Sequence, residues 1–336
     1  MAVTAKEISK KLGISESAVS LALNNKAGVS TATRKKVFQL AQEMGYDFSR
    51  LSPEDSTPEV GSINFIIYKK NGAVVADTPF FSQISEGINK TCKKNHYYLN
   101  IHYVYDNDNV DMLLDNWKRA GIKGLILLGT EMEKSDLAPF LKCNIPFVLL
   151  DNYFEDLEID SVLINNIQGA YAATNQLIRK YKTQPGYLHS SYSINNFDER
   201  GDGFYKAIRR NGMSTSRSIV HRLTPSVEGA YADMKELLAC KDPLARCYFA
   251  DNDLIAAGVI RCLKEAGYSI PGDIAVIGFD DQPLCTYIDP PLSTVQVPKQ
   301  YMGQTAVNRL ITLIEESQSS PLKIEISTKI IKRKTF

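Results

Sequence analysis

The sequence lacks the patterns that mark several common classes of protein. Its six cysteines are scattered and form no C-x-x-C pair, which argues against a zinc site and fits reduced thiols in a cytoplasmic protein. No apolar run approaches the length of a membrane span, and the start of the chain lacks the apolar core of a secretory signal. We therefore expect a cytoplasmic protein with no metal and no membrane contact.

The motifs of the major enzyme classes are also missing. The sequence contains no G-x-S-x-G, G-x-x-x-x-G-K-S/T, H-E-x-x-H or G-x-G-x-x-G pattern. Its four histidines form no recognisable constellation. Carboxylates at the ends of predicted strands can in principle do acid–base work, so turnover of candidate sugars would reopen the question. We expect no enzyme and no cofactor.

The first 50 residues predict a DNA-binding helix-turn-helix. Thr4 can cap a first helix that ends at Gly13, where a left-handed backbone is tolerated. Ser15 can cap a second helix, and Ser30 a third that ends at Gly45. Two helices joined by a tight turn that contains glycine are typical of a recognition helix placed in the major groove. The alternative is a small three-helix domain that contacts another protein.

The charge distribution favours DNA at this end of the chain. Residues 1–50 hold eight cations and four anions, a net charge of +4, whereas the whole 336-residue chain has a net charge of +1. The other 286 residues therefore sum to −3. A basic segment on a slightly acidic body suits attraction to phosphate at one end only.

The remainder predicts a large α/β body behind a linker. Residues 47–60 are polar and contain two prolines, as in a linker. Beyond them, short apolar segments alternate with amphipathic ones, which indicates parallel sheets covered on both faces by helices. The predicted strands are Ser62–Tyr68, Tyr98–Tyr105, Gly124–Leu128, Pro146–Leu150, Tyr187–Ser190, Arg246–Ala250 and Ile274–Phe279. The predicted helices are Phe80–Asn95, Val110–Ala120, Ile167–Lys180, Glu199–Asn211, Val227–Ala239, Asp253–Ala266 and Lys299–Glu316. The alternation recurs too often for one sheet, so we expect two similar lobes.

Polar clusters follow three of these strands. They are Asp151-Asn152, Asp251-Asn252-Asp253 and Asp280-Asp281. Ligands of such sheets bind beyond the carboxyl ends of the strands, where these side chains and Arg200 can contact a small polar ligand. For any single residue the alternative is a helix cap, especially at Asp253 and Asp281.

The chain resembles the LacI/GalR family of bacterial transcription regulators essentially from end to end. The residues that carry the resemblance are the head Thr4–Asn24 with Val29–Arg34 and Met44–Tyr46, then Thr78–Phe81, Ile145–Asp151, Glu199-Arg200-x-x-Gly203-Phe204, Asp251–Asp253, Ile270–Asp281, Pro290–Val295, Met302-Gly303 and Ile331–Arg333. The resemblance implies a helix-turn-helix head, a hinge, and a body like that of periplasmic sugar-binding proteins. It also implies a homodimer that reads a palindromic double-stranded DNA operator and binds a sugar or sugar derivative between its lobes.

The resemblance implies domain boundaries as well. We expect a head at 1–46, a hinge at 47–60 and a body at 61–336. The chain would cross between lobes near residues 163, 293 and 321. The first lobe would then hold about 61–163 and 293–321, and the second about 164–292 and 322–336. No helical repeat follows Ile331–Phe336, so we expect a dimer and not a tetramer.

The site residues are carried over by position. Base contacts would come from Glu16, Ser17 and Leu21, and phosphate contacts from Thr4, Ser15, Ser20, Asn24, Ser30 and Thr33. Effector contacts would come from Tyr68, Phe80, Phe81, Asp151, Arg200, Asn252 and Asp280. One of the two phenylalanines could stack on the apolar face of a sugar while the other belongs to the core of its helix.

Three departures from the family's pattern carry further predictions. Leu21 replaces an arginine that would read guanine, so we expect an unusual operator in which Leu21 favours a thymine methyl and Glu16 a cytosine amino group. Asp55 stands where the family inserts a leucine into the minor groove, which predicts weak DNA bending or none. Lys69, placed near Arg200, would favour an anionic effector, and the alternative is a solvated loop.

Two other functions stay open on these residues. A regulator of the same type could be controlled by a partner protein, with the pocket secondary. A pure small-molecule binding protein could share the same body, but the basic head and the missing signal peptide argue against it.

Overall fold

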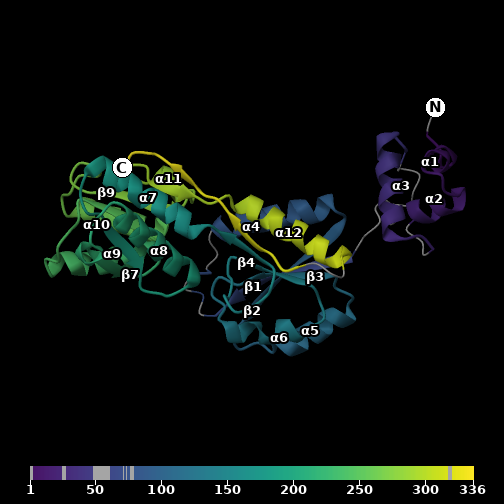
Figure 1. The fold of residues 1–336 in the computed structure, drawn as a ribbon, viewed down its shortest axis with the longest axis horizontal. Helices are drawn as coiled ribbons and strands as arrows, with labels where there is room; N and C mark the ends of the chain where they lie inside the picture. Colours follow the sequence, from purple (N-terminus) through teal and green to yellow (C-terminus); the bar gives the residue numbers. More distant parts are fainter. Residues whose placement is uncertain are drawn as a thin grey trace.

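The head consists of three short helices around a small core of its own. The structure, a computed structural model, describes residues 3–24, 28–47, 61–70, 72, 74–75, 79–316 and 320–336. The head helices are α1 (Ala5–Leu12), α2 (Glu16–Leu23) and α3 (Thr31–Glu43). Their core is built from Ile8, Val19, Ala22, Leu23, Val37, Phe38 and Ala41. Figure 1 shows the head set apart from the body, at the end of the first lobe.

The helix ends of the head follow the predicted capping chemistry. The Ser15 hydroxyl accepts from the Ala18 amide at 3.1 Å, and the Ser30 hydroxyl accepts from the Thr33 amide at 3.1 Å. The Thr4 amide donates to the Glu7 carboxylate at 2.7 Å, and Gly13 ends α1 with a left-handed backbone (φ 67°). These bonds satisfy amides that a helix start would otherwise leave without partners.

The body contains two six-stranded sheets, which define a first and a second lobe. The first sheet has the order β11-β5-β4-β3-β1-β2 and is parallel throughout. Its strands are β1 (Gly61–Lys69), β2 (Tyr97–Tyr105), β3 (Gly124–Leu128), β4 (Phe147–Leu150), β5 (Ser161–Ile164) and β11 (Lys323–Ile326). The second sheet has the order β12-β10-β9-β8-β6-β7, parallel except for β12. Its strands are β6 (Gly186–Ser190), β7 (Val220–Leu223), β8 (Cys247–Ala250), β9 (Ala275–Asp280), β10 (Ser293–Gln296) and β12 (Lys329–Ile331).

Helices cover both faces of each sheet (Figure 1). In the first lobe these are α4 (Pro79–Lys94), α5 (Val110–Arg119), α6 (Ala138–Lys142) and α12 (Lys299–Glu315). In the second they are α7 (Asn166–Tyr181), α8 (Asn195–Arg210), α9 (Val227–Ala239), α10 (Asp253–Glu265) and α11 (Leu284–Tyr287). Central strands such as β3 and β9 are buried along their whole length, as parallel strands between two helical layers must be. The predicted α/β class with two lobes is confirmed.

Glycines allow two helices of the first lobe to pack closely. A Cβ at Gly87 of α4 would lie 2.0 Å from the Gln300 carbonyl oxygen, and one at Gly303 of α12 would lie 2.4 Å from the Ile84 carbonyl oxygen. Any side chain at either position would force the helices apart. This contact ties α12, which follows the second lobe in the chain, firmly to the first lobe.

The chain crosses between lobes a few residues later than predicted. The strand β10 lies in the second sheet, although the range 293–321 assigned it to the first lobe. The strand β11 lies in the first sheet, although the range 322–336 assigned it to the second. The crossings therefore follow β5, β10 and β11. These short strands mix polar and apolar residues, so their sequences do not show where a crossing falls. Hinge residues 48–60 lie outside the described residues.

Candidate functional site

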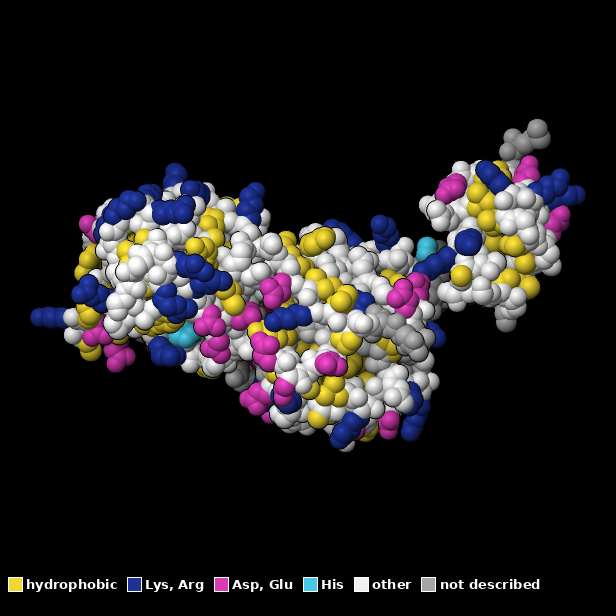
Figure 2. Space-filling model, in the orientation of Figure 1, with side chains coloured by type: hydrophobic (Ala, Val, Ile, Leu, Met, Phe, Trp, Pro, Cys, Tyr) yellow, Lys and Arg dark blue, Asp and Glu magenta, His cyan; other side chains and the backbone are white. Residues whose placement is uncertain are grey.

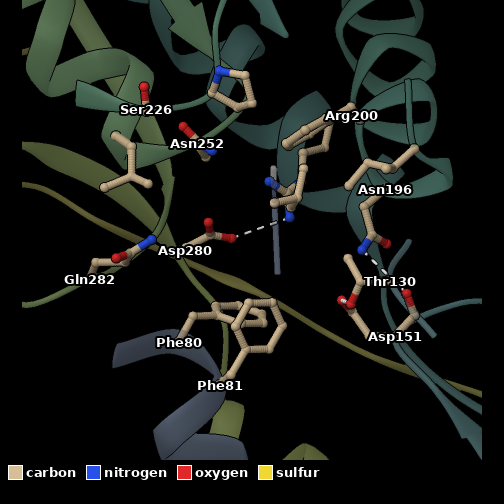
Figure 3. A pocket seen from close by; sticks show the side chains of 15 residues that line it. Phe80, Phe81, Thr130, Asp151, Asn196, Arg200, Ser226, Asn252, Asp280 and Gln282 are labelled. Atoms are coloured by element: carbon tan, nitrogen blue, oxygen red, sulfur yellow. Dashed lines mark hydrogen bonds and ion pairs between the residues drawn. The ribbon is translucent and has the colours of Figure 1, made fainter. Parts of the chain in front are cut away.

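Three strand ends from different parts of the chain meet at one pocket between the lobes. Asp151 follows β4 in the first lobe, whereas Asn252 follows β8 and Asp280 ends β9 in the second. We call this the interlobe pocket; its lining is Val74, Phe80, Phe81, Thr130, Asp151, Ile194, Asn196, Phe197, Arg200, Pro225, Ser226, Asn252, Leu254, Asp280 and Gln282. Figure 3 shows the two phenylalanines facing the polar side chains across this space. The carboxyl ends of parallel strands thus form the site.

Arg200 is the central cation of the pocket. It lies in the second turn of α8, and its residue is only 3% exposed. Its guanidinium donates to the Asn166 side-chain oxygen at 2.9 Å, to the Asp251 carbonyl and to the Asp280 carboxylate at 3.2 Å. The guanidinium carbon stacks 3.8 Å from the centroid of the Phe279 ring. A guanidinium has five N–H groups, so this network holds it flat and leaves donors for a ligand.

Asp151 is the acceptor that the protein leaves incompletely satisfied. One carboxylate oxygen accepts from the Thr130 hydroxyl at 2.7 Å, while the buried Oδ1 has no hydrogen-bond partner among the described residues. Burial raises the pKa of this carboxyl to about 6, although Thr130 and Arg200 oppose the shift. A buried oxygen without a donor is costly unless a ligand supplies one. Asp151 is therefore suited to accept a hydrogen bond from a ligand hydroxyl.

Asp280 lies between two cations. Arg200 donates to its carboxylate, and the buried Lys299 ammonium donates to its main-chain carbonyl. Burial raises the pKa of Asp280, and the two cations counter that rise. Burial also lowers the pKa of Lys299. Because Lys299 begins α12 just after the crossing from β10, it links the pocket to that crossing.

The opposite wall of the pocket is aromatic. Phe80 and Phe81 begin α4, with ring centroids 5.0 Å apart and planes at 76°. Both are buried, at 7% and 8% exposed, and both belong to the main core. Phe80 and Phe81 both line the pocket as well, so neither ring belongs to the core alone, contrary to the alternative considered from the sequence. Apolar ring faces opposite carboxylates, amides and a guanidinium suit a ligand with one apolar and one hydroxylated side.

Six of the seven predicted effector residues lie together in this lining. Tyr68 is the exception, because its hydroxyl donates to Asp106 at 3.0 Å and its ring packs in the separate core around Trp117. Sequence reasoning missed Thr130, Asn196, Ser226 and Gln282. Asn196 was hidden because α8 begins at Asn195 and not at Glu199, so Arg200 does not open the helix.

Asn252 and the neighbours of the strand-end residues also have structural roles. Asn252 is the N-cap of α10 and accepts from the Ile255 amide at 2.8 Å, a role predicted for Asp253. Asp253 instead accepts from the Gln282 amide and the Thr294 hydroxyl. Asp281 binds Arg333 at 2.6 Å and does not cap a helix. Position at a strand end therefore does not by itself distinguish a residue that contacts ligand from one that caps a helix or binds another side chain.

The lip of the pocket differs from its prediction. The Lys69 ammonium lies 5.0 Å from the centroid of the Tyr103 ring and is not part of the lining, so the predicted approach to Arg200 is wrong. The lip is held by Glu131, whose buried carboxylate accepts from the amides of Lys70, Gly72, Val74 and Val75 at 2.8–3.0 Å. Lys69 is paired with Tyr105 of β2, two residues beyond Tyr103, so Lys69 and Tyr103 lie on the same face of the sheet.

The predicted DNA contacts lie on one small head. Six of them are exposed: Thr4, Ser15, Glu16, Ser17, Ser20 and Ser30. Leu21, Asn24 and Thr33 are half-buried. Ser15 and Ser30 are also N-caps, so their backbone amides lie at helix N-termini, where phosphates bind favourably. Glu16 and Ser17 are therefore more accessible to a DNA groove than Leu21 is.

Comparisons with known proteins match both parts of the chain. Residues 4–48 match the family model of bacterial regulatory proteins of the lacI family, and residues 174–336 match that of the periplasmic binding protein-like domain. The HTH-type transcriptional repressor PurR of Actinobacillus pleuropneumoniae serotype 3 is 27% identical over 335 residues, which cover 99% of this chain and 98% of PurR.

Two solved structures are similar to the whole chain or to its body. A LacI family regulator from Enterococcus faecium with bound ribose is 26% identical, with a TM-score of 0.69 over 81% of this chain and 98% of its own. The lac repressor dimer bound to operator and the anti-inducer ONPF is 23% identical, with a TM-score of 0.73 over 100% and 99% of the two chains. Among the described helices, none is both long and apolar enough to cross a membrane.

Proposed function

Because the chain belongs to the LacI/GalR family of bacterial transcription regulators, we propose that it is a DNA-binding repressor controlled by a small effector held between its lobes. Since its relatives are transcription regulators, the proposal is that the interlobe pocket binds its ligand without transforming it. The proposed compartment is the cytoplasm, because a repressor of bacterial genes acts on the chromosome. The proposed divisions are a head at 1–46, a hinge at 47–60 and a body at 61–336.

The observation that carries this proposal is the incomplete polar network of the interlobe pocket. Among the described residues, Arg200 has three acceptors and keeps N–H groups without an acceptor, and Asp151 has an oxygen without a donor. A ligand that bridges the two would contact a residue of the second lobe and one of the first. The affinity of such a ligand then depends on the relative orientation of the two lobes. A change in that orientation would couple ligand binding to DNA binding by the head.

The pocket chemistry favours a neutral, hydroxylated effector of the carbohydrate type. Hydroxyls both donate and accept, so one sugar can satisfy Asp151, Asn252 and Arg200 together. The facing rings of Phe80 and Phe81 suit the apolar side of such a ligand. On the face drawn in Figure 2, Asp and Glu side chains gather near the junction of the lobes, which disfavours a strongly anionic ligand.

The head supplies operator recognition in this proposal. Glu16, Ser17 and Leu21 read bases, and Thr4, Ser15, Ser20, Asn24, Ser30 and Thr33 contact phosphates. Support comes from the exposure of six of these nine side chains and from the net charge of +4 in residues 1–50. The operator would be palindromic, because two heads related by a twofold axis read two half-sites.

The protein acts as a homodimer, and we assign the dimer surface to β2. This strand ends the first sheet and leaves one edge without a neighbouring strand among the described residues. Tyr98, Ile101, Tyr103 and Tyr105 are each about half exposed along it. An exposed apolar edge strand is a liability in a monomer and fits a partner of the same kind. Ile101→Lys should lower the mass seen by analytical ultracentrifugation from dimer to monomer.

The test of the proposed function is a binding titration of the full chain. Fluorescence anisotropy is measured on DNA from the gene's own upstream region, at two salt concentrations, with and without a panel of sugars and sugar phosphates. The proposal expects site-specific, salt-sensitive binding that one neutral sugar shifts. Phe80→Ala should retain DNA binding and lose the response. Binding that no compound shifts would point to control by a partner protein.

A further inference from the structure

A second cavity adjoins the interlobe pocket. We call it the outer cavity; its lining is Lys70, Val74, Thr130, Glu131, Met132, Glu133, Lys134, Asn152, Phe154, Tyr192, Ser193, Ile194, Asn195 and Asp198. Val74, Thr130 and Ile194 line both cavities, so the two are contiguous. The residues up to Phe154 come from the first lobe and those from Tyr192 onward from the second. A ligand there would also bridge the lobes.

The inner wall of the outer cavity is rigid. The Glu131 carboxylate is occupied by backbone amides of the lip. The Asn152 side chain donates to the Gly129 and Met132 carbonyls at 2.7 and 2.9 Å, and accepts from Asn195 of the other lobe at 2.9 Å. These groups have little capacity left for a ligand, but they fix the shape that a ligand meets.

The outer wall offers an aromatic surface and free polar groups. Tyr192 of the second lobe is 41% exposed, and Phe154 of the first lobe is half-buried in the same lining. Within the described part of the chain, neither the Tyr192 hydroxyl nor the Asn195 side-chain oxygen makes a hydrogen bond. Asp198 accepts only from the Ser193 hydroxyl, at 3.2 Å. Two rings with nearby hydroxyl, amide and carboxylate groups match the apolar face and the hydroxyls of a sugar ring.

The cations of this cavity are neutralised. Lys70 lies 3.0 Å from Glu133 and 3.3 Å from Asp136, and Lys134 pairs with Asp156. No lysine of the cavity is therefore available as an unopposed charge for a phosphate or carboxylate. The outer cavity therefore favours a neutral glycosyl unit over an anionic one.

The sizes of the two cavities support a joint occupant. The interlobe pocket alone has a volume of about 110 Å³, and the outer cavity about 400 Å³. Small-molecule sites in proteins usually span about 300–1,000 Å³. The outer cavity lies within this range and the interlobe pocket lies below it, so a ligand of usual size that occupies the interlobe pocket extends into the outer cavity.

We propose that the outer cavity is a subsite for a second neutral glycosyl unit, so that the effector is a disaccharide or a larger glycoside. One unit would lie on Phe80, Phe81 and Arg200, and the next on Tyr192 and Phe154. This inference rests on the proposed function, because it extends the ligand of the same interlobe pocket. The second unit would add contacts to both lobes and so strengthen the coupling to the head.

Isothermal titration calorimetry of the purified full chain tests the subsite. Cellobiose, maltose, lactose and xylobiose are each compared with glucose, galactose or xylose. We expect one disaccharide to bind at least tenfold more tightly than its component monosaccharides. Tyr192→Ala should weaken that disaccharide at least fivefold and leave the monosaccharide affinity unchanged. Tyr268→Ala, at a residue of similar exposure (36%) that lines neither cavity, is the matched control and should change neither affinity.

The outcomes separate this inference from the proposed function. If a monosaccharide binds as tightly as every disaccharide, or if Tyr192→Ala weakens both equally, the subsite is overturned while the sugar-controlled repressor stands. If no sugar binds while the protein still binds its DNA, the sugar effector of the proposed function falls, and the subsite with it.

Discussion

Glu131 is predicted to hold the lip that forms one wall of both cavities. Its Oε1 accepts from the Val74 and Val75 amides, and its Oε2 from those of Lys70 and Gly72. In Glu131→Gln one of these oxygens becomes an NH₂ group, which cannot accept. Two amides then lose their acceptor, at a cost of about 1–3 kcal/mol each if they are fully buried. We therefore expect a loss of about 2–6 kcal/mol in local stability, nearer the lower value because Lys70, Gly72 and Val74 are only half-buried.

The matched control is Glu228→Gln. The Glu228 side chain is 78% exposed, pairs with Arg261 and lines neither cavity. Exposed pairs contribute about 0–1 kcal/mol, so this variant should behave like the parent protein. Both variants replace a glutamate by glutamine and so remove one negative charge. A difference between them therefore reports the buried hydrogen bonds and not the charge.

Hydrogen exchange and effector binding measure the effect. The amides of Lys70, Gly72, Val74 and Val75 should exchange faster in Glu131→Gln, and the effector should bind about tenfold more weakly, since reordering the lip takes up part of the binding free energy. DNA affinity without effector should not change. Equal exchange rates and equal effector affinities in the two variants would refute the reasoning.

Three further predictions concern the pocket, the recognition helix and the hinge. Burial raises the pKa of Asp151 to about 6, and a ligand hydroxyl stabilises its ionised form, so effector affinity measured by calorimetry should rise as pH passes through about 6. The same raised pKa makes folding stability fall as pH rises from about 4 to about 6, because over this range the folded protein still holds a proton that the unfolded chain has released. With rising pH, effector affinity should therefore increase while stability decreases, and Asp151→Asn should remove both trends. Leu21→Arg should move the preferred base at one operator position to guanine, by about 1–3 kcal/mol in a selected site library, and an unchanged preference would exclude Leu21 from base reading. In a circular-permutation assay the operator should show little central bending, because the hinge position of the family's leucine holds Asp55; a large kink would contradict this.

The sequence allowed the elements and the general place of the site to be predicted. Parallel strands place their carboxyl ends at one edge, so Asp151, Asn252 and Asp280 could be expected to converge before any geometry was known. The helix caps of the head could be predicted because they depend only on residues two or three positions apart.

Features that depend on distant contacts could not be predicted in this way. Glu131 carries no local signal, since its partners lie about 60 residues earlier in the chain. The direction of Lys69 depends on Tyr103 of the neighbouring strand. The true start of α8 depends on Asn195 and Asn196, which bond across to the first lobe. In each case tertiary contacts decide among options that the local sequence leaves open.

The central claim is that one effector between the lobes and one operator at the heads are thermodynamically coupled. Its most direct test is the affinity of the effector for the free protein and for the protein saturated with operator DNA. Linkage requires the ratio of these affinities to equal the factor by which saturating effector changes operator affinity. The account predicts two equal factors, well removed from one. Effector affinities that are the same with and without operator would contradict it.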